Sequence, residues 1–151
     1  MAAEDAAAAA QMLVTLMLNG QLCGISVLAV RDVLGAQPLT RIPLAPPEVA
    51  GSLNLRGRIV TAIDLRTRLR LPPAAERTAR MSVVTELGGE LYALLVDQVS
   101  EVMTLPAKNF EPPPPTLPAE WASHSAGIYR LEAGLLVLLD VPRLLAIGGA
   151  A

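Results

Sequence analysis

One stretch, from Gly51 to Arg66, most constrains how this chain of 151 residues can fold. Two short apolar runs flank a tight turn at Arg56 and Gly57. The run before the turn alternates apolar and polar residues, as a half-buried strand does. The run after it, Ile59 to Ile63, is almost continuously apolar, which is typical of a strand covered on both faces. The stretch predicts a β-hairpin in which Gly57 supplies a position that accepts positive φ.

Arg56 falls at the tip of this predicted hairpin, and two interpretations of it remain open. In the first, Arg56 is an ordinary solvated charge in a turn. In the second, its guanidinium reaches beyond the fold and pairs with a carboxylate of a partner through two parallel hydrogen bonds.

The second half of the chain repeats the pattern of the first. Shifts of 69 and 76 positions align glycines, aliphatic residues and acidic residues in the same order: Gly20 with Gly89, Leu22 with Leu91, Val27 with Val96, Val30 with Val99, Asp32 with Glu101, Val33 with Val102, Gly51 with Gly127, Leu55 with Leu131 and Asp64 with Asp140. A repeat of this kind usually means repeated structural units. We therefore expect an all-β fold of two small barrels with about five strands each.

The turn and proline signals set the expected boundaries. The first barrel is expected at about 11–71 and the second at about 80–140, separated by a polar linker. A short C-terminal helix is expected at about 141–147, with Asp140 as its N-cap and Pro142 in its first turn. The Ala-rich residues 1–10 are expected to be a disordered tail, without the basic region of a signal peptide.

Composition excludes several classes of protein. The net charge is −2 and aromatic residues make up only 3% of the chain, which argues against a nucleic-acid groove. The single cysteine, Cys23, excludes an intramolecular disulfide framework and is typical of a reducing compartment. No stretch approaches the roughly 18 apolar residues that span a bilayer. We therefore expect a soluble, cytoplasmic protein with no direct membrane insertion.

The search for a reaction centre finds little. The only histidine, His124, lies between Ser123 and Ser125, but sequence neighbours rarely have the geometry of a catalytic triad. One histidine and one cysteine cannot make a usual zinc site, and no glycine pattern suits a phosphate. The sequence thus predicts no enzyme, no metal and no cofactor.

Four other features each have a structural and a functional interpretation. Asp64 and Asp140 end equivalent strands, which favours capping over acid–base chemistry. Trp121 is either a core residue or an interface anchor, and Cys23 is expected in the core. Residues 112–115, all proline, form either a loop spacer or a polyproline ligand.

A large aliphatic core with exposed turns and no reaction centre describes a binding module, and here a family resemblance appears. The stretch from Gly51 to Arg66 resembles the signature of CheW proteins, the chemotaxis coupling adaptors. The resemblance runs from about Leu13 to Leu145. It includes the block ending at Val33, the block 94–99 and the closing block 138–140.

The resemblance implies two SH3-like five-stranded barrels in tandem. It also implies a non-catalytic scaffold that couples the cytoplasmic tips of chemoreceptors to a CheA-type histidine kinase. The partner-binding positions that it implies are Val30, Asp32, Gly51, Asn54, Arg56 and Gly57. Asp32 stands where the family usually has Glu, and Thr61-Ala62 replaces the usual Pro-Val or Pro-Ile. An adaptor of the same fold in a non-flagellar pathway, such as surface motility or gene regulation, is the alternative.

Overall fold

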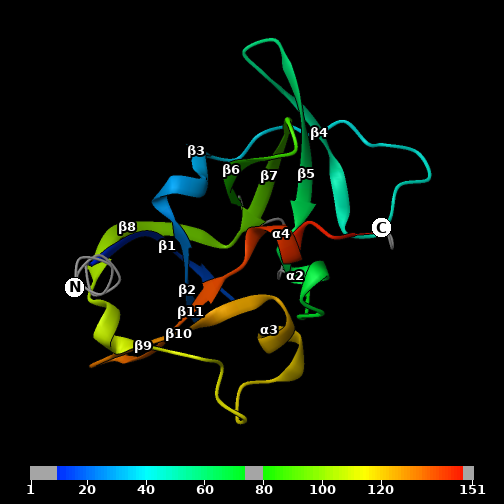
Figure 1. The fold of residues 1–151 in the computed structure, drawn as a ribbon. Coiled ribbons are helices and arrows are strands. Elements are labelled where there is room, and N and C mark those ends of the chain that lie inside the picture. Colours follow the sequence, from blue (N-terminus) through cyan, green and yellow to red (C-terminus); the bar gives the residue numbers. More distant parts are fainter. Residues whose placement is uncertain (1–9, 74–79, 148–151) are drawn as a thin grey trace.

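The computed structural model describes residues 10–73 and 80–147, and it contains two β-sheets (Figure 1). Sheet A has six strands in the order β8-β1-β2-β11-β10-β9, and sheet B has five in the order β3-β6-β7-β5-β4. The mostly β architecture and the number of strands per unit confirm the predicted fold class. The expected disordered tail lies almost entirely outside the described residues, and so does most of the expected linker.

The predicted hairpin from Gly51 to Arg66 forms β4 and β5, in sheet B. Sheet A consists of β1 (Gln11–Leu18), β2 (Gln21–Ser26), β8 (Gln98–Leu105), β9 (Phe110–Glu111), β10 (Ser125–Leu131) and β11 (Gly134–Leu139). Sheet B consists of β3 (Val30–Leu34), β4 (Val49–Leu55), β5 (Arg58–Asp64), β6 (Met81–Leu87) and β7 (Glu90–Val96).

The helical elements are short. They are η1 (Val27–Ala29), α2 (Leu65–Arg68), η2 (Ala107–Asn109), α3 (Ala119–Ser123) and α4 (Val141–Leu144). In Figure 1, α2 and α4 lie between the strands of sheet B and those of sheet A. None of the helices within residues 10–73 and 80–147 has the length and apolar character needed to cross a bilayer.

The two sheets preserve the internal repeat strand by strand. The order of sheet B, β3-β6-β7-β5-β4, becomes β8-β1-β2-β11-β10 when each strand is replaced by its repeat partner. This is the order of the first five strands of sheet A, and β9 is added at its edge. Each sheet also contains one parallel pair at the equivalent place, β5 with β7 and β11 with β2. Gly51 and Gly127 mark equivalent register shifts, in β4 and β10.

The repeat units nevertheless exchange strands, so the predicted barrel boundaries do not match the sheets. All strands of sheet B come from residues 30–96, whereas sheet A combines residues 11–26 with residues 98–139. The predicted division at 71–80 separates β5 from β7, which pair in parallel. The hairpins β1–β2 and β6–β7 carry the same apolar pattern. Local sequence is therefore compatible with pairing of β5 to either β7 or β2.

One hydrophobic core joins the two sheets. Its largest cluster contains fully or almost fully buried side chains from both sheets and from three helices: Leu16, Leu18, Cys23, Ile25, Ile63, Leu65, Leu69, Val83, Leu94, Val96, Trp121, Ile128, Val137, Leu139, Val141 and Leu144. Burial of apolar surface contributes about 25 cal/mol per Å² and has no directional preference. This cluster therefore holds the two sheets together.

The two equivalent aspartates cap helices, as predicted. The Asp64 carboxylate accepts hydrogen bonds from the backbone N–H groups of Arg66 and Thr67, at 3.0 and 3.4 Å. The Asp140 carboxylate accepts one from the N–H of Arg143 at 3.0 Å. The helix that Asp140 begins is shorter than expected, because regular helix ends at Leu144 rather than at 147.

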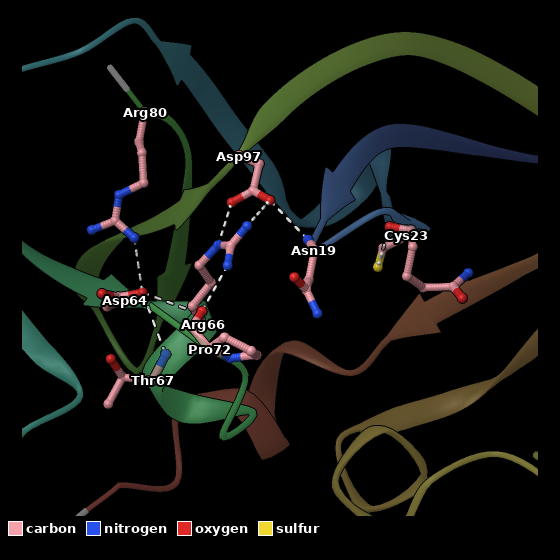
Figure 2. A network of polar contacts seen from close by, with 9 residues as sticks. Asn19, Cys23, Asp64, Arg66, Thr67, Pro72, Arg80 and Asp97 are labelled. Atoms are coloured by element: carbon pink, nitrogen blue, oxygen red, sulfur yellow. Dashed lines mark hydrogen bonds and ion pairs between the residues drawn. The ribbon is translucent and has the colours of Figure 1, made fainter. Parts of the chain in front are cut away.

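Asp97, the single residue between β7 and β8, is the centre of a polar network (Figure 2). Its Oδ1 and Oδ2 accept hydrogen bonds from Nε and Nη2 of Arg66, at 2.8 and 2.7 Å. Oδ2 also accepts one from the backbone N–H of Asn19 at 2.7 Å. The hydrogen bonds from Arg66 lower the pKa of Asp97 below its usual range, and the nearby charge of Arg80 adds to this effect.

This lowered pKa predicts how stability depends on pH. The ionised carboxylate stabilises the fold above the unfolded-state pKa of Asp, about 3.9, and the contribution is lost as pH falls through the lower native value. Asp97→Asn should therefore lower the free energy of unfolding by about 2 kcal/mol near neutral pH. The difference from wild type should shrink below about pH 4. Urea denaturation at a series of pH values tests this, and a difference independent of pH would contradict it.

Candidate functional site

The hairpin between β4 and β5 projects a tight turn from sheet B. Arg56 and Gly57 both have positive φ, 52° and 86°, as the central residues of a type I′ turn require. The side-chain Oδ1 of Asn54 accepts a hydrogen bond from the N–H of Gly57 at 2.9 Å. The sequence indicated positive φ only for Gly57, and the strained conformation of Arg56 appears only in the structure.

Arg56 is paired within the chain but remains open to solvent. Its Nη2 lies 3.1 Å from Oδ2 of Asp32 on β3, and the two side chains are 77% and 26% exposed. An ion pair this exposed contributes only about 0–1 kcal/mol to stability. A carboxylate of a partner can therefore compete for the guanidinium at little cost to the fold. Asp32 also accepts a hydrogen bond from the N–H of Val33 at 2.8 Å, which orients its carboxylate.

Three further charged residues surround this pair and were not predicted. Arg31, Arg58 and Glu86 line, with Asp32 and Arg56, a shallow cavity of about 190 Å³. Arg31 Nε lies 3.3 Å from Glu86 Oε1, and Arg58 Nη2 donates to the carbonyl of Gly89 at 3.5 Å. We call Asp32, Asn54, Arg56 and Gly57, together with these three residues, the hairpin site.

No local sequence signal places Glu86 in the hairpin site. Arg31 and Glu86 lie on β3 and β6, which pair antiparallel although they are separated by more than 50 positions. Arg58 could have been included from the sequence, because it faces Leu55 across the predicted turn. The site is therefore assembled from four strands of sheet B, β3, β4, β5 and β6, and from the turn between β4 and β5.

The structure does not bring the other two predicted residues into the hairpin site. Val30 is partly buried and packs against the main core cluster. Gly51 is buried on β4, where a Cβ atom would lie 2.7 Å from the backbone oxygen of Thr40. Both residues lie on strands of sheet B, but neither lines the cavity beside Arg56.

The expectation that the strand from Ile59 to Ile63 is covered on both faces is wrong at Ile59. Its side chain is 67% exposed, while Val60 and Ala62 on the same strand are fully buried. Ile59 pairs with Asn54 across the hairpin, so it lies on the face opposite to the neighbouring pair of Leu55 and Arg58, which lines the charged cavity. The exposure of Ile59 could not be predicted from the continuous apolar run, because hydrophobic periodicity does not distinguish the end of a strand from its covered centre.

The residues that were considered for catalysis or binding outside the hairpin site contribute to packing and to local hydrogen bonds. His124 is buried and follows α3, a short helix that was not predicted. Its Nδ1 lies 2.8 Å from the carbonyl oxygen of Glu120, and the hydroxyl of Ser123 donates to the carbonyl of Ala119. Trp121 and Cys23 are buried in the core cluster, as the structural interpretation of each predicted.

The fold and the hairpin site define a β-rich binding module, and the comparisons assign its family. Residues 12–148 match the family model of the CheW-like domain. The chemotaxis protein CheW of Klebsiella aerogenes is 30% identical over 129 residues, 85% of this chain and 78% of that protein. The CheW protein of Rhizobium meliloti is 28% identical over 117 residues, 78% of this chain and 76% of that protein. The chain belongs to the CheW family.

A solved structure agrees with this assignment. The scaffolding protein TtCheW from Thermoanaerobacter tengcongensis superposes with a TM-score of 0.82 at 27% identity, covering 93% of this chain and 95% of that protein. CheW proteins are non-enzymatic scaffolds of chemotaxis signalling. The predicted family, adaptor class and absence of enzymatic activity are thereby confirmed.

Proposed function

We propose that this chain couples chemoreceptors to a CheA-type histidine kinase, and that the hairpin site contacts one of the two partners. The observation that supports the contact is Arg56, a highly exposed guanidinium that a rigid turn holds outward and that pairs with Asp32. A partner carboxylate can replace that pairing. On the other face of the same hairpin, the exposed Ile59 supplies an apolar surface that a partner can cover.

The cavity beside Arg56 supports the same proposal. It contains three arginines and two carboxylates, so it carries a net positive charge at neutral pH. Complementary charge accelerates association and selects among partners. We therefore expect the contacting surface of the partner to carry Asp or Glu close to an apolar residue. Val30 and Gly51 contribute indirectly, by setting the shape of sheet B. In this proposal the chain works in the cytoplasm, where receptor arrays recruit it to the membrane.

A reconstitution tests the coupling itself. The chain is mixed with a receptor signalling fragment on vesicles and with the cognate kinase, and the kinase that sediments with the vesicles is measured. We expect kinase recruitment to depend on this chain and to saturate with its concentration. Recruitment that is equal with and without the chain would contradict the proposal. Recruitment only with receptors and kinase of a motility or gene-regulation pathway would favour the alternative pathway.

A further inference from the structure

The two sheets are connected covalently at only two places within residues 10–73 and 80–147. The chain passes from sheet A to sheet B through η1, between β2 and β3, and returns through Asp97, between β7 and β8. A single residue therefore carries the second crossover. Any change in the angle between the sheets must be absorbed by backbone rotation at these two places.

Asp97 is bonded to both sheets at once. Its N–H donates to the carbonyl of Met17 at 3.1 Å, and its carboxylate accepts from the N–H of Asn19, so it is tied to the first hairpin of sheet A. The same carboxylate receives the two parallel hydrogen bonds from Arg66, which follows β5 of sheet B. Figure 2 shows Arg66 and Asn19 approaching Asp97 from different elements. We call these three residues the Asp97 junction.

The other atoms of Arg66 are also engaged. Its Nη1 donates to the carbonyl of Pro72 at 2.6 Å, and its N–H donates to Asp64, which also pairs with Arg80. The Arg66 side chain is only 13% exposed. A planar guanidinium held in this way has little freedom to follow a moving carboxylate.

The first crossover differs in character from the second. The repeat shift of 69 positions places Leu28 at the position equivalent to Asp97, and the Leu28 side chain is 88% exposed. It lines, with Met12 and Phe110, an open and largely apolar cavity of about 700 Å³. An apolar side chain cannot form the directional polar bonds that Asp97 forms, so the two equivalent crossovers are restrained unequally.

From this asymmetry we propose that the Asp97 junction sets the angle between sheets A and B, and that this fixed angle lets one molecule hold two partners at once. The core cluster and the hydrogen bonds from Arg68 to the carbonyls of α4 and Ala146 also join the two halves. The Asp97 junction differs because it acts at a crossover of the chain, where two parallel hydrogen bonds have one preferred geometry. Asp97 and Arg66 are positioning residues, outside the hairpin site. The second half of the inference rests on the proposed coupling function.

Two variants weaken the junction while preserving side-chain size or charge. Asp97→Asn is nearly isosteric but removes the charge, and Arg66→Lys keeps the charge but loses the planar fork. Glu111→Gln is the matched control, because it removes the charge from an exposed ion pair with Arg130, inside sheet A. Circular dichroism and melting temperature establish that each variant is folded.

The first measurement reports the angle directly. Spin labels are attached at Glu90→Cys, in sheet B, and Glu132→Cys, at the β10–β11 turn of sheet A, both exposed positions. The native Cys23 is buried and does not compete for the label. We expect a narrow distribution of label distances in the wild-type background and the control, and a broader one in both junction variants. An unchanged distribution in folded junction variants would overturn the inference.

The second measurement reports the functional consequence. Affinity for the kinase regulatory domain and for the receptor fragment is measured separately, and then the affinity for one partner with the other already bound. We expect the junction variants to bind each partner within about twofold of wild type but to lose about tenfold in affinity for the second partner. Equal losses in all three affinities would overturn the coupling role. If wild type binds neither partner, the proposed function fails, and the label distances still decide whether the junction sets the angle.

Discussion

Replacing Arg56 by Glu is expected to weaken the complex with the kinase regulatory domain or with the receptor fragment by about 2–5 kcal/mol. The turn holds the Arg56 side chain outward, and the proposed partner surface is acidic. Reversal of the charge therefore leaves two like charges facing each other at the contact. By the relation between free energy and Kd, this is a loss of roughly 30-fold to several thousand-fold. Calorimetric titration against each partner measures it.

The fold itself should tolerate this substitution. The Arg56–Asp32 pair is exposed, so its loss and the new repulsion should change the free energy of unfolding by at most about 1 kcal/mol. Arg130→Glu is the matched control, because Arg130 is also an exposed arginine paired with an acidic residue, Glu111, but it lies on sheet A. If Arg56→Glu binds both partners like the control does, Arg56 is only a solvated turn charge.

Replacing Gly51 by Ala is expected to produce the largest loss of stability, at least about 3 kcal/mol. The φ of Gly51 is 150°, which L residues rarely adopt, and the new Cβ would lie 2.7 Å from the oxygen of Thr40. Thr40 cannot easily withdraw, because it exchanges two backbone hydrogen bonds of 2.8 Å with Ser52. Denaturant unfolding measures the loss.

Gly20→Ala separates the conformational cost from the steric overlap. Gly20 also has positive φ, 80°, but a Cβ added there would meet no described atom within 4 Å beyond its own chain neighbours. We expect this variant to lose only about 1 kcal/mol, from backbone strain. A similar loss for both variants would show that the contact with Thr40 relaxes. A stable Gly51→Ala that fails to bind would instead make Gly51 a direct contact residue.

Much of the secondary structure is determined locally, which is why the sequence predicts it. The alternation before the turn in β4, the tight turn at Arg56-Gly57 and the caps at Asp64 and Asp140 each depend on residues within a few positions of one another. The short helix α3 was missed because its N-cap, Pro118, forms no side-chain capping bond and its five residues give little periodic signal.

Four of the seven residues of the hairpin site were also predicted from the sequence. Asn54, Arg56 and Gly57 share one turn, and the family resemblance added Asp32, which lies 3.1 Å from Arg56. The resemblance also selected Val30, which is partly buried on β3, and Gly51, which is buried on β4. A motif records that a residue is required, without distinguishing a contact from a packing requirement. Burial and the space around each side chain make that distinction.

The sequence by itself determined the strands, the turns and the existence of a repeat, because these follow from hydrophobic period and backbone preference over short distances. Only the tertiary structure decided that the repeat units exchange hairpins. Since β1–β2 and β6–β7 have nearly the same pattern, the choice of parallel partner depends on packing between residues far apart in the chain. The same long-range pairing brings Arg66 to Asp97 and Glu86 to Arg31, and those ion pairs have no local signature.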